Sequence, residues 1–413
     1  MTTSSAVVST DMFEMLSPVL YVSRIFCLQP LKWTKMNYGY VITKSAAYTA
    51  YSNVVIVFFV VASICGLSQV YQLEVVYLIR MANSTERYVT FSDVSVVLFP
   101  SFFGVLMTTF KIDNYIDYYN QLRKIDTLLQ KNPPKSKKYR VVLVTTVFFT
   151  AVILIFDFVL WVQLTCPYGG ILSIVASYLP YYTCYCFTVV MELVYWQFVH
   201  TIKTKIMLLN NTLREAIEDC SVDNFMRIDR KKINNVVDTL KIHDLKKQNK
   251  PIKKTPNLQQ IGDLICAYET LTEAANSVND CYGLVILIVI LGCLIHLLVT
   301  PYALYGLVLN TGDRMFIVSQ SIWMFGHVLR LLLIVEPCHG CLIEQANTSA
   351  LICRLMCMEM DKQVKKSLKF FFLCLSQRKI EFTAFGLTKI NRELLTGIAG
   401  AVTTYLVILF QFN

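Results

Sequence analysis

Residues 284–309 read LVILIVILGCLIHLLVTPYALYGLVL and contain no Lys, Arg, Asp or Glu. A helix needs roughly 20 predominantly apolar residues to cross the hydrocarbon core of a bilayer. It can do so because it satisfies its backbone polar groups within the segment. This stretch therefore predicts a membrane-spanning helix. Further stretches of the same character lie at 47–68, 88–110, 141–163, 171–199, 315–336 and 393–412.

The composition of the whole chain agrees with this assignment. Its 413 residues are 55% hydrophobic and 16% charged, and the mean hydropathy is +0.51. Soluble domains contain about a quarter charged residues. We therefore predict an all-α membrane protein with seven transmembrane helices.

Basic residues are distributed unevenly along the chain. Lys and Arg are concentrated before the first span and in the loops after the second, fourth and sixth spans, whereas the other loops contain only Arg80, Arg87 and Arg314. Basic loops favour the cytoplasmic side. The bias predicts a multi-pass plasma-membrane protein with a cytoplasmic N-terminus and an extracellular C-terminus. The net charge of +10 is explained by these loops, so no nucleic-acid partner is expected.

Glycosylation motifs are consistent with this orientation. The sequon at Asn83 lies in the first loop, which the charge bias places outside, and Asn83 is the predicted glycosylation site. The sequons at Asn210 and Asn347 fall on the cytoplasmic side and are interpreted as chance matches.

Two segments outside the spans are polar or interrupted. Residues 1–46 form a cytoplasmic segment without the features of a cleaved signal, and within it 12–30 is apolar but interrupted by Pro18, which favours an interfacial segment over an eighth span. Residues 217–258 are polar and basic, which predicts a flexible cytoplasmic linker near anionic lipid.

The segment 341–376 has a helical pattern of apolar residues. Its apolar positions recur every three or four residues and predict one amphipathic helix that continues the sixth span into the cytoplasm. These positions are Leu342, Ala346, Ala350, Cys353, Cys357, Met360, Val364, Leu368 and Phe371. We expect 341–392 to form cytoplasmic anchor helices below spans one to four (47–216), spans five and six (259–340) and the seventh span (393–413).

Several spans contain ionisable or strongly polar side chains, which are costly in a membrane and are functional candidates. With the orientation above, they all fall in the outer half of the membrane. They are Asp93, Asp157, Tyr178, Tyr181, Tyr182, His296, Thr300, Tyr302, Gln320, Trp323 and His327. We expect a pocket in which a Trp ring covers the C–H face of a polyhydroxylated ligand and polar groups bind its hydroxyls. The alternative is that these residues hold helices together or anchor them at the interface.

Deeper in the spans, Arg330 requires a partner, and Glu192 and Glu336 lie at a similar depth or near the inner ends. We predict a structural ion pair for Arg330. The sequence contains no catalytic or nucleotide-binding motif, so neither an enzymatic activity nor a cofactor is predicted. The pair Cys338 and Cys341 is only a weak zinc pattern, and no metal site is predicted.

The chain ends TTYLVILFQFN at 403–413, without a charged tail. Thr404-Tyr405, five apolar residues and Gln411-Phe412 resemble the signature that closes insect gustatory receptors. Two further blocks are similar to the fructose-sensing branch of that family, IWMFGHVLRLLLIVEPCH at 322–339 and FTAFGLTKINRELLT at 382–396. SDVSVV at 92–97 also resembles the second span of that branch. The loops show no such resemblance.

The resemblance implies a homotetrameric, ligand-gated cation channel in which four copies of the last helix line one pore. The spacing of Val402, Tyr405, Leu409 and Phe412 places them on one helical face, and four Phe412 rings would close a pore by dewetting. Gln411 would bridge subunits or face the ions. Because this helix contains no ring of carboxylates, we expect a non-selective channel. The alternative is a helix that packs or faces lipid without lining a pore.

The resemblance also extends to the pocket. Gln320 and Trp323 match a pair in the sixth span that is similar to the sugar-binding pair of the fructose branch, and Thr300 and Tyr302 match its fifth-span positions. The fourth span departs, because ASYLPYY at 176–182 lacks the His-Trp that precedes the tyrosine motif there. The expected ligand is a small sugar or polyol, either fructose or one like myo-inositol.

Two other classes remain open on sequence alone. A seven-helix receptor coupled to G proteins would need its N-terminus outside the cell, and a transporter would move its ligand across the membrane.

Overall fold

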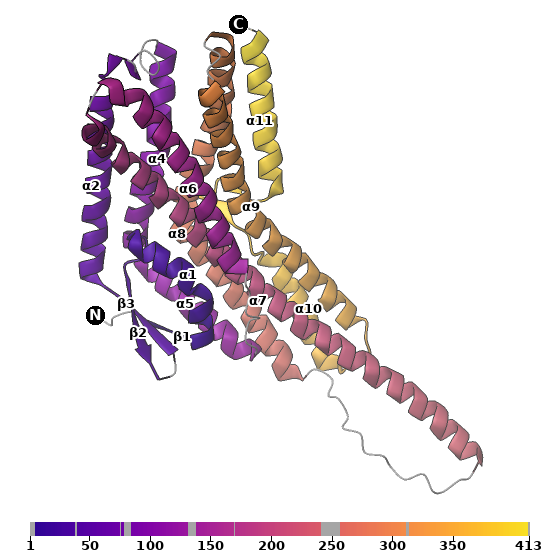
Figure 1. Cartoon of the computed structure of the whole chain (residues 1–413). Coiled ribbons are helices and arrows are strands. Elements are labelled where there is room, and N and C mark those ends of the chain that lie inside the picture. Colours follow the sequence, from indigo (N-terminus) through magenta and orange to yellow (C-terminus); the bar gives the residue numbers. More distant parts are fainter. Residues whose placement is uncertain are drawn as a thin grey trace.

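The computed structural model describes residues 5–37, 39–74, 76–77, 84–130, 138–168, 170–240, 257–310 and 314–411, and it forms a bundle of long helices (Figure 1). The N-terminal region consists of β1 (Ser5–Val8), α1 (Thr10–Ile25), β2 (Leu31–Met36) and β3 (Gly39–Lys44). The long helices that follow are α2 (Ala46–Val70), α4 (Ser84–Phe110), α5 (Ile112–Leu129), α6 (Lys138–Thr165), α7 (Ile171–Leu240), α8 (Leu258–Asn310) and α9 (Arg314–Met356). A short helical turn at Cys166–Tyr168 separates α6 from α7, and the chain ends with α10 (Lys362–Gln377), β4 (Thr383–Ala384), β5 (Thr388–Lys389) and α11 (Arg392–Gln411).

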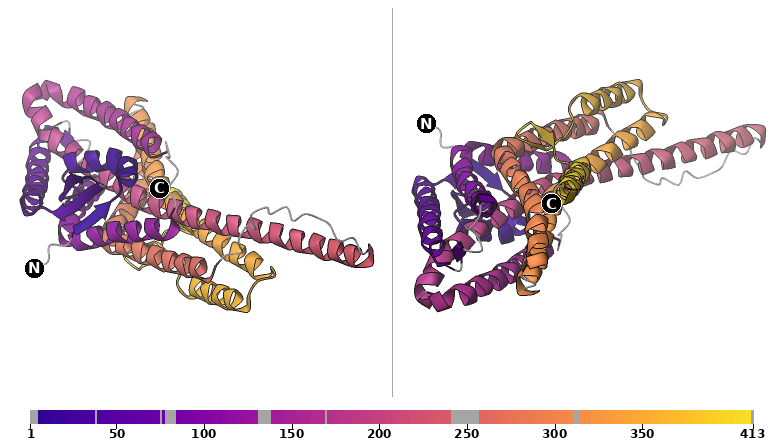
Figure 2. Two further views of the ribbon diagram at one scale, coloured as in Figure 1. Left: turned by 90° about the horizontal axis from the view of Figure 1, so that it is seen from below. Right: turned by 90° about the horizontal axis from the view of Figure 1, so that it is seen from above.

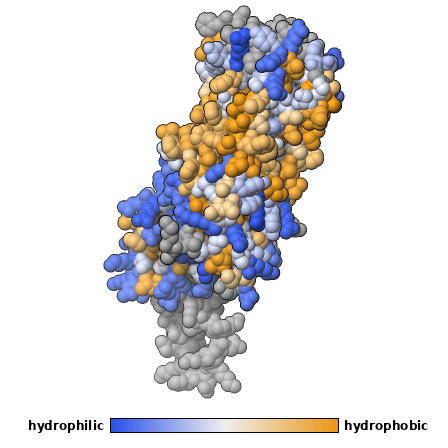
Figure 3. Space-filling model, turned by 90° about the vertical axis from the view of Figure 1, so that its left-hand side faces the viewer, coloured by the Kyte–Doolittle hydropathy of each residue, from blue (hydrophilic) through white to orange (hydrophobic). Residues whose placement is uncertain are grey.

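The predicted spans all fall within helices. Among the described residues, six helices are long and apolar enough to cross a membrane, namely α2, α4, α6, α7, α8 and α9. The seventh predicted span forms α11, a helix of 20 residues. Figure 3 shows hydrophobic residues as a band across one face of the molecule, with hydrophilic residues above and below it. Such a band is expected of a protein that is solvated by lipid around its middle.

The two ends of the chain lie at opposite ends of the bundle. The N-terminal strands lie at the lower end in Figure 1, whereas α11 runs upward to the C-terminus. This is the arrangement expected when a chain crosses the membrane an odd number of times. Which end faces the cytoplasm remains a prediction from the basic loops.

A small β-sheet is an addition to the predicted all-α fold. Its three antiparallel strands have the order β1-β3-β2, and α1 follows β1. The Phe13 ring of α1 stacks on Tyr40 of β3 at 3.7 Å, and Trp33 of β2 contacts Tyr119 of α5 edge-on at 5.4 Å. These aromatic contacts fix the sheet to the helices beneath it. The segment expected to be interfacial, 12–30, thus begins as part of α1.

The predicted linker at 217–258 is in part wrong. Helix α7 continues to Leu240 and projects well beyond the bundle (Figure 2). Residues 200–240 contain neither Gly nor Pro, and charged residues with long side chains are good helix formers. A polar composition therefore extended the helix here and did not end it. Residues 241–256 lie outside the described part of the chain.

The predicted single helix over 341–376 is interrupted. Helix α9 ends at Met356, and α10 begins at Lys362 after Asp361, whose side chain accepts a hydrogen bond from the Gln363 backbone N–H at 3.3 Å. In α10 the predicted apolar positions Val364, Leu368 and Phe371 are buried. In α9 the buried face is instead the one formed by Cys341, Gln345, Thr348, Ile352 and Leu355.

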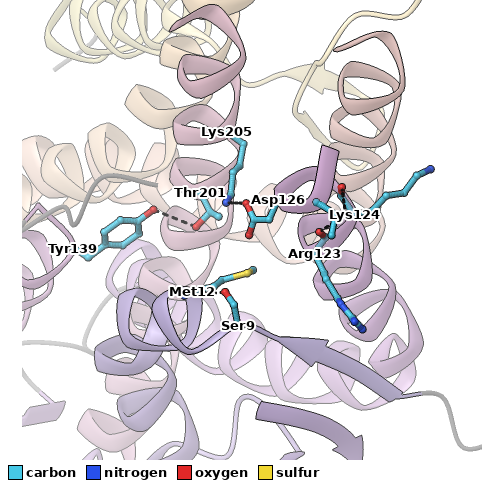
Figure 4. A network of polar contacts seen from close by, with 9 residues as sticks. Ser9, Met12, Arg123, Lys124, Asp126, Tyr139, Thr201 and Lys205 are labelled. Atoms are coloured by element: carbon cyan, nitrogen blue, oxygen red, sulfur yellow. Dashed lines mark hydrogen bonds and ion pairs between the residues drawn. The ribbon is translucent and has the colours of Figure 1, made fainter. Parts of the chain in front are cut away.

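A buried ion pair connects α5 to α7 below the apolar band. The Lys205 ammonium contacts the Asp126 carboxylate, and the Lys205 side chain is fully buried (Figure 4). Burial raises the pKa of Asp126, and the neighbouring Lys205 partly opposes that shift. Nearby, the hydroxyls of Tyr139 and Thr201 are 3.2 Å apart, which joins α6 to the same helix (Figure 4).

Asn210 also connects two helices. Its side-chain amide donates to the Glu344 backbone carbonyl of α9 at 2.9 Å and accepts from the Thr348 hydroxyl at 2.6 Å. Because Asn210 is fully buried, its sequon cannot accept a glycan in the folded chain.

Candidate functional site

A cavity lies near the end of the bundle that is opposite the β-sheet. Its residues come from the C-terminal ends of the spans in α2, α6 and α8 and from the N-terminal ends of α4, α7 and α9. Its volume is about 80 Å³, measured as the space open to the centres of water-sized spheres. The lining residues are Leu67, Tyr71, Asp93, Val94, Val97, Asp157, Trp161, Tyr178, Tyr181, Tyr182, Tyr185, His296, Thr300, Gln320, Trp323 and His327.

The structure brings together most of the residues expected to bind ligand. Asp93, Asp157, Tyr178, Tyr181, Thr300, Gln320, Trp323 and His327 all line this cavity. The side chain of Tyr302 lies outside the described part of the structure, as do Asn83, Phe412 and the side chain of Leu409. The remaining predicted pore residues, Tyr405 and Gln411, are exposed on α11.

Asp157 is the most enclosed acid of the cavity, with 7% of its surface exposed. Its Oδ2 atom accepts a hydrogen bond from the Tyr182 hydroxyl of α7 at 2.6 Å, and its Oδ1 atom accepts one from the Ser319 hydroxyl of α9 at 3.1 Å. Each carboxylate oxygen has a second lone pair and can accept another donor. Asp157 thus joins three helices and still has acceptor capacity towards a ligand.

The opposite wall contains two stacked imidazole rings. His296 and His327 are 4.1 Å apart between ring centroids with an interplanar angle of 15°, and His296 Nδ1 lies 3.3 Å from Asp93 Oδ1. The Trp323 ring lies nearly parallel to His327 at 5.9 Å. His327 is 1% exposed, and its Nδ1 atom has no hydrogen-bond partner among the described residues. Buried polar atoms without partners are rare, so a group that enters the cavity is the natural partner of this nitrogen.

Below these rings lies the ion pair predicted for Arg330. Its Nε atom donates to both carboxylate oxygens of Glu192, at 3.0 and 3.1 Å, and Glu192 is fully buried. The guanidinium also lies over the Tyr185 ring at 5.1 Å from the centroid. The prediction of an ion pair is confirmed, and its partner is Glu192. Since its charge is matched, the pair adds no net charge to the floor of the cavity.

Close helix packing places the fourth span against the first. A Cβ atom added at Gly66 of α2 would collide with the backbone carbonyl of Ser177 in α7. Small residues allow such approaches between membrane helices. The next residues along each helix, Leu67 and Tyr178, line the cavity.

The sequence analysis omitted Tyr71, Trp161 and Tyr185, which also line the cavity. Trp161 lies four residues after Asp157, and Tyr185 three residues after Tyr182, so helical spacing would have placed each on the face of a candidate already named. Neither residue is conspicuous in the sequence, because a single aromatic side chain is not costly in a membrane.

The arrangement suits a small ligand with both polar and C–H surfaces. Seven Tyr and Trp rings, one of them just after α2 and the others from α6, α7 and α9, line the cavity together with a few hydroxyl, amide, carboxylate and imidazole groups. An apolar wall with a small number of placed polar groups is the usual form of a ligand pocket. Within the described residues, no group of three or more His, Cys, Asp or Glu side chains is placed to hold a metal ion.

Helix α11 is joined to the helix that carries this cavity. Arg392, at its first residue, donates from Nε and Nη2 to the two carboxylate oxygens of Glu336 in α9, at 2.9 and 2.8 Å. Tyr405, Val407 and Ile408 on α11 are each close to half exposed. The chain alone therefore leaves much of this apolar helix uncovered.

Known proteins match the chain over most of its length. At 26% identity it aligns with the gustatory receptor for sugar taste 43a of Drosophila melanogaster, covering 96% of this chain and 97% of that protein. At 24% identity it aligns with putative gustatory receptor 28b of the same species, covering 52% of this chain and 46% of that protein.

Its fold is similar to that of the solved insect olfactory receptor OR5 from Machilis hrabei, with a TM-score of 0.66, 11% identity and coverage of 97% of this chain and 98% of that one. The predicted seven-helix membrane fold is thereby confirmed. The family model described as 7tm Chemosensory receptor matches residues 16–413. The chain therefore belongs to the 7tm chemosensory receptor family, as a multi-pass membrane receptor, and the resemblance to insect gustatory receptors is confirmed.

Proposed function

We propose that this protein is a taste receptor that acts as a ligand-gated, non-selective cation channel and opens on a small sugar or polyol. The observation that carries the proposal is the cavity, which Trp323, Gln320 and His327 line together. A flat ring beside donors and acceptors is complementary to a ligand with C–H faces and hydroxyls. The full-length similarity to a receptor named for sugar taste favours the same class of ligand.

The cavity differs from the one expected for fructose at one wall. Ala176 and Ser177 precede the tyrosines of α7, where the fructose-sensing branch has two ring-bearing residues. This departure favours a ligand of different shape, and a cyclic polyol such as myo-inositol is our first candidate beside fructose.

The channel part of the proposal depends on assembly. Helix α11 is apolar, packs mainly along α8 and α9 within the described chain, and leaves Tyr405 and Ile408 exposed. In a homotetramer four such helices would cover one another around a central path. Tyr405, Leu409, Gln411 and Phe412 are the proposed pore and gate residues.

The test is expression of the chain alone in cells that lack other receptors, followed by a panel of sugars and polyols under voltage clamp. We expect a current with one or a few compounds and single-channel openings in excised patches. Silence to the whole panel, with the protein confirmed at the cell surface, would contradict the proposal. Currents that follow the substrate gradient without single-channel openings would favour a transporter.

A further inference from the structure

The described lining of the cavity contains two acids and no Lys or Arg. Of its lining residues, Asp93 and Asp157 are acids, His296 and His327 are the only basic groups, and no Lys or Arg lines it. The two imidazole rings stack on each other, with 4.1 Å between their centroids.

Asp157 is the acid of this cavity that has no basic partner among the described residues. The basic partner of Asp93 is His296, at 3.3 Å. Within the described residues, no Lys, Arg or His nitrogen lies within 4 Å of the Asp157 carboxylate, whose recorded partners are the hydroxyls of Tyr182 and Ser319. The nearby Arg330 is matched by Glu192. A buried acid without a cation is costly, and ionisable groups in membrane spans are usually paired.

The rings around Asp157 are arranged as a cation would require. Tyr182, which holds the acid, lies 6.5 Å from Tyr178, and Tyr178 lies 6.5 Å from Trp161. Across the cavity, Tyr185 contacts Trp323 edge-on at 5.1 Å. Aromatic faces attract cations through their quadrupole, and the Arg330 guanidinium already lies over Tyr185.

His327 provides an independent observation. This residue lines the cavity, and its buried Nδ1 atom has no hydrogen-bond partner within the described part of the chain. In the imidazole tautomer protonated at Nε2, the Nδ1 atom accepts a hydrogen bond, and both oxygens of Asp157 retain acceptor capacity. An ammonium group has three N–H donors and no acceptor, so it is complementary to these acceptor atoms of His327 and Asp157.

We propose that the preferred ligands of this cavity are aminopolyols, that is, polyols in which a protonated amine replaces one hydroxyl, with the ammonium at Asp157. This inference rests on the proposed function, since it assigns the ligand class of the same cavity. The carbon chain and remaining hydroxyls would be bound by Trp323 and Gln320, and the ammonium would supply the missing positive charge.

The test compares matched pairs of compounds on the purified full-length protein. The pairs are sorbitol with glucamine, which is sorbitol with one terminal hydroxyl replaced by an amine, and scyllo-inositol with scyllo-inosamine. Binding is measured by titration calorimetry in detergent at neutral pH, where an alkyl ammonium is charged. Without a membrane potential, pore block and permeation do not affect the result.

We expect the amine of at least one pair to bind about tenfold more tightly than its hydroxyl partner. In Asp157→Asn that ratio should fall to about one. An amide can still accept from Tyr182 and donate to Ser319, so the variant should fold, which its size-exclusion profile reports. Asp157→Glu should retain part of the preference. Asp263→Asn, the same change near the far end of α8, is the control and should keep the full ratio.

Each result is decisive. Equal or weaker binding of both amines, with the polyols bound, overturns this inference and leaves the proposed function standing. A preference that survives in Asp157→Asn overturns the assignment to Asp157. If none of the four compounds binds, the aminopolyol inference fails, and the sugar panel decides whether the proposed function fails with it.

Discussion

At the scale of single residues, substitution of Trp323 tests whether the cavity binds the ligand. The Trp323 ring contacts Tyr185 edge-on and lies over His327, so it holds the shape of one wall as well as offering a flat face to a ligand. We predict that Trp323→Ala abolishes the sugar or polyol response while the protein still reaches the cell surface. The measurement is a dose-response curve with surface labelling.

The control for this variant is Phe325→Ala. Phe325 lies two residues further along α9, is 57% exposed and does not line the cavity. Its removal should leave the response unchanged. Normal sensitivity in Trp323→Ala would move the binding site elsewhere in the molecule.

Lys205 and Asp126 allow a second residue-scale prediction. Removal of one member of a buried ion pair leaves the other charge unmatched and costs about 3 kcal/mol or more, whereas replacement of both by apolar residues is often neutral. We predict that Lys205→Met markedly lowers the temperature at which the purified protein loses its size-exclusion peak. The double variant Lys205→Met with Asp126→Leu should recover most of the loss.

Lys203→Met is the matched control for Lys205→Met. Lys203 lies on the same helix and is only half-buried. A small effect is expected there. If the double variant of the Lys205 and Asp126 pair is no more stable than Lys205→Met alone, the two charges do not act as a pair.

The sequence identifies those cavity residues that are energetically costly inside a membrane. Asp93, Asp157 and His327 are such residues, because an ionisable group in a span is costly and therefore a functional candidate. Trp161 and Tyr185 are not, because aromatic residues in spans are common and only their neighbours in space give them a role. An ion pair was expected for Arg330. Its partner, Glu192, could be identified only from the structure, which shows where α7 packs against α9.

At the scale of elements, the contact between α9 and α11 connects the cavity to the proposed pore helix. Glu336 and Arg392 are 44% and 58% exposed, so their bridge contributes little to stability. Its effect on the position of α11 can still be measured. We predict that Arg392→Glu shifts the concentration for half-maximal response by up to about fivefold.

The reversed pair, Glu336→Arg with Arg392→Glu, should restore the response of the native protein. Lys389→Glu is the control, because Lys389 bridges Glu381 at 2.9 Å next to the small hairpin and does not contact α9 through that bridge. A reversed pair that behaves like the single variant would show that the bridge does not couple the two helices.

The elements themselves were predicted well where a pattern was long. All seven apolar stretches form helices. Each is long enough to span the membrane, and a single spanning segment must satisfy its backbone hydrogen bonds within itself. The strands of the N-terminal sheet were missed, since the longest has six residues and its apolar side chains contact α1 and α5, which sequence alone does not reveal. The break before Asp361 was missed because the apolar spacing continues across it.

At the scale of the whole molecule, orientation decides what the cavity can sense. The cavity lies towards the end of the bundle at which α11 ends with Gln411. With the N-terminus in the cytoplasm, the cavity and this end of α11 face the extracellular medium. With the opposite orientation, the same cavity would be reached from inside the cell and could not detect a compound in food.

We predict that a short tag at the C-terminus binds antibody on intact cells, whereas a tag at the N-terminus is detected only after permeabilisation, because the basic loops at the N-terminal end favour the cytoplasm. The variant Asn83→Gln should run faster on a gel by the mass of a glycan, and Asn347→Gln, whose sequon lies on the other side, should not shift. Surface labelling of the N-terminal tag would contradict the orientation, and with it the access of extracellular ligands to Trp323 and Asp157, although the geometry of the cavity would be unchanged.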